Sequence, residues 1–222
     1  MEATSGISGG SLRNYTEAPS VCQGKSMNTT DTSEQALIAR PQRADARRNY
    51  EKVLTAAREA FAEKGESMAL EEIARRAGVG IGTLYRHFPT RQALLEALYV
   101  DEVQGMCRSA AQTDGADPWE ALNSWFEGFI AYLATKRALA AELLNYLDQD
   151  AELFQVCRAS LFEAGEPLLK RAQDAGVVRQ DVTIAEVIQM VVGIAKIPST
   201  EPGQTERLLR IALDGLRYRP EG

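Results

Sequence analysis

Apolar residues recur at intervals of three and four along most of this chain, which is the spacing of one face of an α-helix. The pattern predicts helices over residues 43–64, 70–77, 81–88, 91–111, 118–133, 137–147, 151–175, 184–196 and 204–218. Glycine, proline and short polar runs separate these stretches, and none alternates apolar and polar residues as a half-buried strand does. The sequence therefore predicts an all-α fold of about nine helices.

Several residues are of the types that begin, end or bend helices. Asp117 and Thr183 stand directly before two of the stretches, where their side chains can accept hydrogen bonds from the first free N–H groups. Gly176 follows the end of another, as a left-handed closing residue does. Within that helix, Gly165 and Pro167 predict a kink.

Two of the predicted helices are short and joined by a tight turn. Ile73 and Ala74 lie on the inner face of the first, and Gly78 follows where a left-handed turn residue is needed. The inner face of the second helix is made of Ile81, Leu84 and Phe88. Small alanines on the first helix allow the second to cross it closely. This is the helix-turn-helix pattern, in which the second helix lies in the major groove of DNA.

The outward side chains of the second helix are hydrogen-bond donors. Thr83, Tyr85 and His87 can reach a phosphate, and Arg86 can bind a phosphate or the paired acceptors of guanine. The alternative is an ordinary packed helix pair, but packing requires neither Gly78 nor the outward Tyr-Arg-His set. The chain is therefore predicted to bind double-stranded DNA.

Basic residues gather at the start of the helix predicted over 43–64. Arg47 and Arg48, with Arg43 and Lys52 beside them, oppose the helix dipole, which favours negative charge at that end. A nearby phosphate backbone would explain the placement, and a solvated basic face is the alternative.

Residues 78–99, GVGIGTLYRHFPTRQALLEALY, resemble the tetracycline-repressor (TetR) family of bacterial transcription regulators. The family's Ile-Ala pair, Ala-Gly-Val turn, Thr-Leu-Tyr-x-His-Phe run and charged turn are all present between residues 73 and 91. Ala69 departs from the Ser or Thr that often caps the first short helix. Together with the outward side chains, the resemblance implies these DNA-binding residues: Arg47, Arg48, Thr83, Tyr85, Arg86, His87 and Arg91.

The resemblance implies a DNA-binding domain (42–103) followed by a helical ligand-binding and dimerisation domain (104–222), and the polar composition before them predicts a disordered tail (1–41). The tail is polar, and Met27 is a second candidate start within it. A DNA-contacting arm is the alternative to a passive tail, although basic residues are sparse there.

Composition limits the other functions. The net charge is −6, so DNA binding has to be local. Cys22, Cys107 and Cys157 are scattered, which indicates reduced thiols rather than a metal site or redox switch. The single histidine, His87, lies in the recognition helix, and no catalytic, cofactor-binding or metal-ligand motif is present. No secretory signal or membrane-spanning run is present, so we expect a cytoplasmic protein without a cofactor.

The stretch 118–133 is rich in aromatic residues, which form either core or the wall of a ligand cavity. The family resemblance implies a pocket between the central helices for a small, mostly apolar or aromatic molecule. The residues expected nearest to it are Trp125, Phe129, Tyr132, Phe154, Cys157 and Met190.

The last two helices are expected to pair with their copies in a homodimer. The helix over 184–196 is apolar around too much of its circumference for one buried stripe, although core packing alone is the alternative. The predicted interface residues are Val187, Val191, Leu209 and Leu213.

The resulting hypothesis is a homodimeric repressor that binds a two-fold operator and is released by a small molecule. The first alternative is an architectural or activating DNA-binding protein without an effector. The second is an enzyme that uses the helical cavity.

Overall fold

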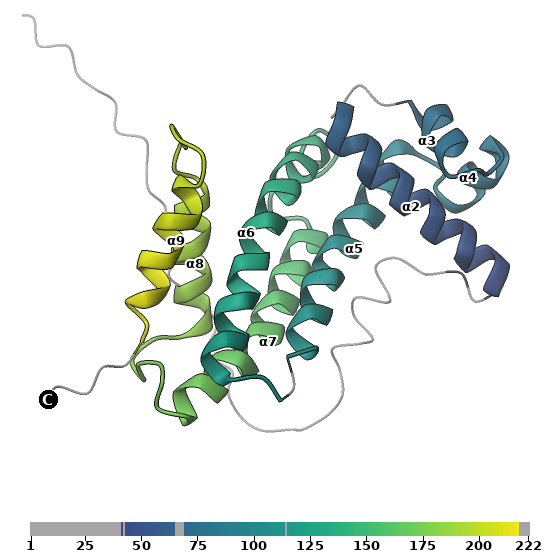
Figure 1. Ribbon diagram of the computed structural model, residues 1–222. Helices are drawn as coiled ribbons and strands as arrows, with labels where there is room; N and C mark the ends of the chain where they lie inside the picture. The colour runs from purple at the N-terminus through teal and green to yellow at the C-terminus, as the bar shows by residue number, and fades with distance from the viewer. Residues whose placement is uncertain (1–40, 42, 65–68, 114, 218–222) are drawn as a thin grey trace, which may run out of the picture.

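The computed structural model describes residues 41, 43–64, 69–113 and 115–217. This part of the chain forms eight helices: α2 (Ala44–Lys64), α3 (Leu70–Arg76), α4 (Ile81–His87), α5 (Arg91–Ala111), α6 (Pro118–Leu143), α7 (Glu152–Asp174), α8 (Ile184–Ala195) and α9 (Gln204–Asp214) (Figure 1). Within those ranges there is no strand, only an isolated bridge between Val178 and Arg217. The all-α prediction is confirmed. The predicted tail lies outside the described residues apart from Pro41, as does Cys22.

One predicted pair of helices is a single helix. The break expected between residues 133 and 137 is absent, and α6 continues to Leu143 before turns at 144–147. The reason is that no glycine or proline stands between Leu133 and Leu143, while Leu139 and Leu143 extend the buried face of the helix. The predicted last helix is also shorter than expected, because α9 ends at Asp214.

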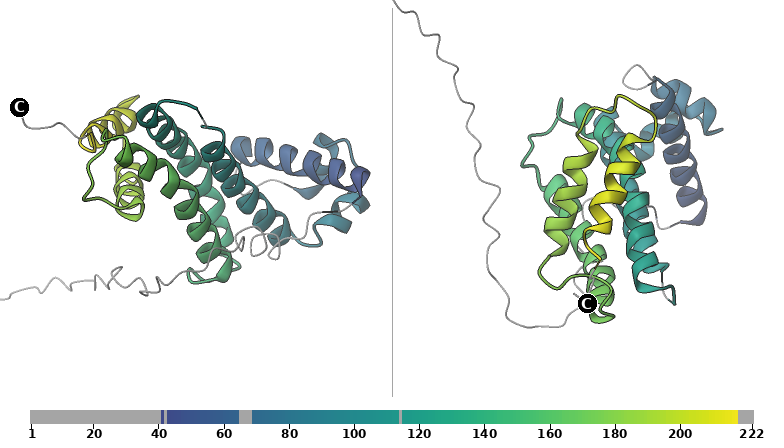
Figure 2. Two further views of the ribbon diagram at one scale, coloured as in Figure 1. Left: turned by 90° about the horizontal axis from the view of Figure 1, so that it is seen from below. Right: turned by 60° about the vertical axis from the view of Figure 1, so that its left-hand side comes forward.

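The helices form three groups along the molecule. Figures 1 and 2 show α2, α3 and α4 as a head at one end, α8 and α9 side by side at the other, and α5, α6 and α7 between them. Helix α5 packs on α2 in the head and on α6 and α7 in the body. Helix α8 covers α6 and α7, and α9 covers α6 and α8. One long helix therefore belongs to both the head and the body.

The predicted helix starts and stops are largely confirmed. The Asp117 side chain accepts hydrogen bonds from the backbone N–H groups of Trp119 (3.0 Å) and Glu120 (3.1 Å). Thr183 and Glu186 form a reciprocal capping box at the start of α8. Gly176, directly after α7, has φ of 68°, which is the left-handed conformation that glycine adopts without strain.

Gly165 lies buried where α7 crosses α6 and α8. A Cβ added there would be 2.8 Å from Cη2 of Trp125 and 2.9 Å from Cδ1 of Ile184. The indole cannot move away easily, because Trp125 is buried and its Nε1 donates to the carbonyl oxygen of Met106 at 3.1 Å. Gly165 therefore allows three helices to approach closely, a role that the predicted kink does not include.

Replacing Gly165 by Ala should lower the free energy of unfolding by about 1–3 kcal/mol, because the added methyl group overpacks this crossing. Gly128→Ala is the matched control within α6, since its Cβ would meet only Cε of Met106, at 3.9 Å. That variant should gain up to about 1 kcal/mol from helix propensity. Urea unfolding followed by circular dichroism at equal protein concentration measures both, and equal effects of the same sign would contradict the close crossing.

Candidate functional site

Helices α3 and α4 form the predicted two-helix unit. Gly78 has φ of 64° in the turn between them, as expected for a left-handed residue. Ile73, Ala74, Leu84 and Phe88 are buried beneath the unit. They pack against α2, where the ring of Tyr50 lies 4.9 Å from the ring of Phe88. The two short helices are thus held by their own apolar contacts and by the longer helix beneath them.

The opposite face of α4 is exposed. Tyr85 is 43% exposed, Arg86 is exposed, and Thr83 is half-buried. The expected inward placement of Ile81 is wrong, because its side chain is 39% exposed. Ile81 is the first residue of a seven-residue helix, so Leu84 alone is buried within α4 and Phe88 follows it. An exposed isoleucine beside Tyr85 can contact the methyl group of thymine.

His87 is half-buried at the end of α4. Its ring meets that of Tyr50 edge-on, with 6.0 Å between the centroids. Burial lowers the pKa of His87, and the adjacent positive charge of Arg86 acts in the same direction. The imidazole is therefore neutral at pH 7 and offers one donor and one acceptor.

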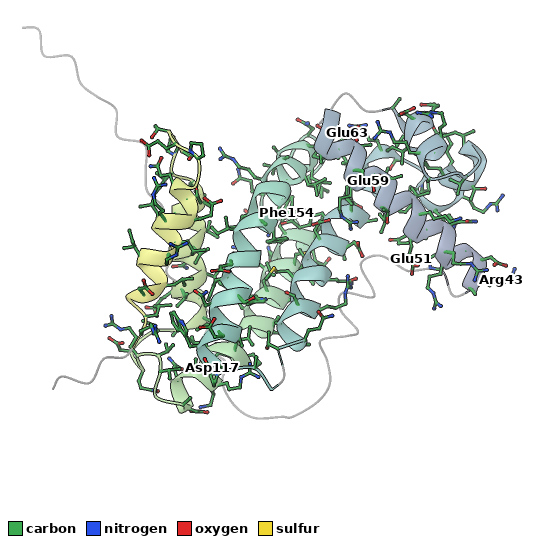
Figure 3. The ribbon with its side chains drawn as sticks, viewed as in Figure 1. Arg43, Glu51, Glu59, Glu63, Asp117 and Phe154 are labelled. Atoms are coloured by element: carbon green, nitrogen blue, oxygen red, sulfur yellow. The ribbon has the colours of Figure 1, made fainter. Side chains whose placement is uncertain are left out.

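Exposed arginines gather at the start of α2. Figure 3 shows Arg43 at one end of this helix and Glu63 at the other, with Glu51 and Glu59 between them. Arg43, Arg47 and Arg48 are exposed, and Arg48 forms an ion pair with Asp45. The predicted local basic surface is therefore present at the start of α2.

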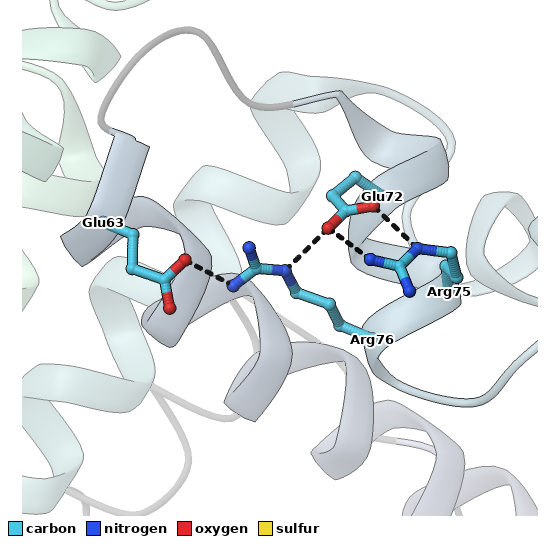
Figure 4. A network of polar contacts seen from close by, with 4 residues as sticks. All are labelled: Glu63, Glu72, Arg75 and Arg76. Carbon is cyan, nitrogen blue, oxygen red and sulfur yellow. Dashed lines mark hydrogen bonds and ion pairs between the residues drawn. The ribbon is translucent and has the colours of Figure 1, made fainter.

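Arginines on α3 are engaged in a network with glutamates (Figure 4). Glu72 accepts from Arg75 at 2.7 and 2.8 Å and from Arg76 at 3.0 Å, and Arg76 also reaches Glu63 of α2 at 2.8 Å. The guanidinium groups of Arg75 and Arg76 lower the pKa of Glu72 to about 2. Ala69 offers no side-chain cap to α3. Glu72, the other half of the absent capping box, instead holds Arg76, and the ion pair of Arg76 with Glu63 links α3 to α2.

Arg91, predicted to contact DNA, turns toward the body. Its Nε donates to Oε1 of Glu142 at 3.1 Å, and it is half-buried. Glu142 lies near the end of α6, is buried, and also accepts from Nδ2 of Asn145 at 3.4 Å. This ion pair joins the first residue of α5 to the end of α6. The sequence analysis did not predict this ion pair, although a glutamate next to Leu143 on an apolar helix face indicates a buried carboxylate that needs a partner.

A second link between head and body lies further along α5. Nη2 of Arg58, on α2, is 2.7 Å from Oδ2 of Asp101, and Nε of Arg58 also pairs with Glu102. Because both carboxylates are on α5, this arginine fixes the head to the same helix from the other side.

A cavity of about 680 Å³ lies between α6, α7 and α8, with Tyr99 of α5 in its wall. Of the six predicted ligand residues, Phe129 and Phe154 line it. Trp125, Tyr132, Cys157 and Met190 lie outside its lining, and the first three of these are buried in the core. The lining also includes three cations that sequence reasoning did not select, Lys136, Arg158 and Lys196.

The four residues predicted for the dimer face point inward instead. Val187, Val191, Leu209 and Leu213 are no more than 3% exposed within the single chain. Both helices pack on α6, so these side chains belong to the hydrophobic core of the single chain. The larger apolar residues that α8 and α9 leave at least partly accessible are different ones: Met190, Val192, Ile194, Leu208 and Ile211.

Other kinds of site are not found in the described ranges. They contain no group of three or more His, Cys, Asp or Glu side chains that could hold a metal ion. Among the same residues, no helix is long and apolar enough to cross a membrane.

Comparisons with known proteins match both ends of the described chain. Residues 53–98 match the family "Bacterial regulatory proteins, tetR family". Residues 117–218 match the family "Transcriptional regulator SbtR-like, C-terminal domain". Among curated proteins, the Transposon Tn10 TetC protein of Escherichia coli is 31% identical over 94 residues, which are 41% of this chain and 48% of that protein. The chain therefore spans about half the length of this curated relative.

Two solved structures are similar over nearly their whole length. The TetR transcriptional regulator SCO0520 from Streptomyces coelicolor is 40% identical with a TM-score of 0.66, and the match covers 76% of this chain and 98% of that one. The TetR transcription regulatory protein from Mycobacterium vanbaalenii is 36% identical, also with a TM-score of 0.66, over 80% of this chain and 100% of that one.

Replacing Arg91 by Met should lower the free energy of unfolding by about 1–3 kcal/mol, because the buried carboxylate of Glu142 loses its charged partner. Lys170→Met is the control. It breaks an ion pair of similar length to Asp174 (3.0 Å), whose side chains are about two-thirds exposed, and should change stability by less than about 0.5 kcal/mol. Denaturant unfolding at equal protein concentration compares the two, and equal losses would mean that the Arg91–Glu142 pair is no anchor.

Proposed function

We propose that the chain, which belongs to the TetR family of bacterial transcription regulators, is a homodimeric repressor that binds a two-fold DNA operator and is released by a small molecule. This family consists of transcription regulators rather than enzymes. An operator-binding protein acts where the chromosome is, so the proposal includes a cytoplasmic location.

The observation that carries the proposal is the exposed face of α4. Tyr85 and Arg86 stand outward from a two-helix unit whose other face is buried, and Ile81 lies beside them. The glycines at 80 and 82 leave open space where side chains would otherwise stand, so the backbone can approach a DNA surface closely. The basic start of α2 supplies further phosphate contacts near the same head. Arg91 is assigned to the link with Glu142 rather than to DNA.

A dimer follows from what a single recognition helix can cover. A two-fold operator is read by two heads, with half-sites about one helical turn apart. The proposed interface lies on α8 and α9, at the end of the molecule opposite the head (Figure 2). Ile211 of α9 is 69% exposed, and an interface on this face would bury its side chain.

Release by a ligand is proposed to act through α6 and α5. Ala140 and Leu144 line the cavity, and Glu142 stands between them in the sequence. A ligand that shifts this end of α6 would move Glu142, and with it Arg91 at the start of α5. The spacing of the two heads in a dimer would then change. Only a ligand that prefers the non-binding spacing weakens DNA binding, and DNA must weaken ligand binding by the same factor.

The direct experiment is selection of genomic fragments by the purified protein, followed by sequencing of the retained DNA. We expect inverted repeats whose half-sites are about one helical turn apart. Retention of fragments without a shared two-fold sequence would contradict the operator and support an architectural protein.

Tyr85→Ala should weaken binding to all DNA sequences. Arg86→Ala should also change sequence preference, because loss of a base contact costs about 1–3 kcal/mol of binding free energy. Lys170→Ala removes a positive charge from α7, far from the head along the chain, and should leave the affinity nearly unchanged. Fluorescence anisotropy with the selected operator and with scrambled DNA measures all three. Unchanged binding by an Arg86→Ala, His87→Ala double variant would contradict the assignment of α4.

Ile211→Arg should shift the protein from dimer to monomer, because it places a charge in the proposed interface. The variant should remain folded, since the side chain is exposed within the single chain. Tyr146→Arg is the control, at a residue of similar character that is 44% exposed in the turns after α6. Sedimentation velocity compares them, and a folded Ile211→Arg dimer would place the interface elsewhere.

A further inference from the structure

The cavity between α6, α7 and α8 combines apolar walls with positive charge. Its apolar wall includes Phe129, Leu133, Phe154, Leu161 and Ile188. Its charged lining residues are Lys136, Arg158 and Lys196, and no Asp or Glu among the described residues lines it. The whole chain carries 31 acidic and 25 basic residues, so the positive sign of this cavity does not follow from overall composition.

Of these three cations, Lys136 is the most enclosed by the protein, because Arg158 and Lys196 are exposed. It is half-buried in α6, with Nζ 5.1 Å from the centroid of the Tyr99 ring and 5.3 Å from that of the Tyr132 ring. Two rings attract an ammonium but do not replace its water as an anion would. Within the described part of the chain, Lys136 makes no ion pair, so its N–H donors are directed to these rings and to the cavity.

A second polar group beside Lys136, the buried hydroxyl of Tyr132, also lacks a hydrogen-bond partner among the described residues. Buried donors without acceptors cost free energy. Tyr132 lies outside the cavity lining, beside Asp101 and Glu102 in a separate hollow, so the case for an anion in the cavity rests on Lys136.

A second hollow next to the cavity is also lined by more cations than anions. It lies between α6, α8 and α9 and shares Lys136 and Lys196 with the cavity. It adds Arg137 and one carboxylate, Glu206. Cations therefore outnumber anions in both spaces.

We propose that the ligand of this cavity is an amphipathic anion, with an apolar body against Phe129 and Phe154 and a carboxylate that pairs with Lys136. The inference rests on the proposed ligand-released function and specifies its ligand class. It adds a negative head group to the mostly apolar ligand expected from the sequence. The volume of about 680 Å³ is within the usual range for small-molecule sites.

The pairing has a pH signature. Burial lowers the pKa of Lys136 to about 8, against the opposing interaction with Cys157 and with a smaller contribution in the same direction from the positive charge of Arg158. A bound carboxylate favours the charged amine, so affinity should be constant below about pH 8 and should fall as pH rises above it. Tyr99, Tyr132 and Cys157 are the other titratable groups near the amine. Burial raises the pKa of both phenols, so neither titrates in that window.

The test uses two matched series of compounds that share a body and differ in head group. One is decanoate, decanol and decylamine, kept below micelle-forming concentrations, and the other is phenylbutyrate, phenylbutanol and phenylbutylamine. Isothermal titration calorimetry on the full chain measures each affinity. In at least one series the carboxylate should bind about tenfold to hundredfold more tightly than the alcohol, as expected for one charge-assisted pairing, and the amine should bind least.

Variants assign the effect to one residue. Lys136→Met should reduce carboxylate binding to the level of the alcohol, leave alcohol binding unchanged and abolish the fall above pH 8. Lys136→Arg should retain most of the preference, and Lys170→Met, outside the cavity, should behave as the wild type. Removing a half-buried charge should not lower the thermal midpoint of the free protein. If Lys136→Met nevertheless fails to fold, the wild-type pH profile and Lys136→Arg carry the same test.

The inference is overturned if alcohol and carboxylate bind equally, if Lys136→Met weakens both alike, or if no compound binds. A parallel operator titration separates it from the proposed function. Release by an alcohol but not by a carboxylate would contradict the anionic ligand and retain the repressor. Carboxylate binding that depends on Lys136 but leaves the operator bound would support the ligand class and contradict release.

Discussion

The position of the head depends on α5, because this one helix is buried in both parts of the molecule. Near its start, Leu94, Leu95 and Leu98 meet Phe61 of α2 and Ile73 of α3 in a contact with almost no free volume. Further along, Val103 and Met106 are buried, and Met106 accepts the hydrogen bond of Trp125 from α6. A packed core does not deform continuously, so a displacement of α5 in the body is carried into the head.

Two ion pairs add to the apolar contacts of α5 with the head and the body. Arg91 and Glu142 fix the start of α5 to the end of α6, and Arg58 holds α2 to Asp101 of α5. The first pair is the more buried, and its carboxylate lies between two cavity-lining residues in the sequence. The end of α6 therefore carries both cavity-lining residues and the carboxylate that holds the start of α5.

Signals for turns and caps were read more reliably from the sequence than helix breaks or long-range contacts were. The turn at Gly78 and the cap at Thr183 depend on neighbours within a few residues, and both were predicted. Arg91 pairs with a residue 51 positions away, so its role could not be read from the charged turn around it. Periodicity likewise identifies an apolar face but not its partner, which is why Val187 and Val191 were assigned to a dimer rather than to the core.

The candidate ligand site illustrates the same limit. Phe129 and Phe154 were found because aromatic residues are conspicuous in a sequence, whereas Lys136 reads as a solvated lysine until α5, α6 and α7 are assembled around it. The net charge of −6 gives no indication of a local positive cavity. Placement of a charge relative to apolar walls is a property of the packed helices.

The central claim is that the cavity and the DNA-binding face are coupled through α5. The most direct measurement is a linkage cycle: the dissociation constant of the operator with and without a saturating cavity ligand, and that of the ligand with and without operator. The account predicts that each weakens the other by the same factor, about 5- to 150-fold for coupling of the usual size. A ligand that calorimetry shows to be bound, but that leaves operator affinity unchanged in both directions, would contradict it.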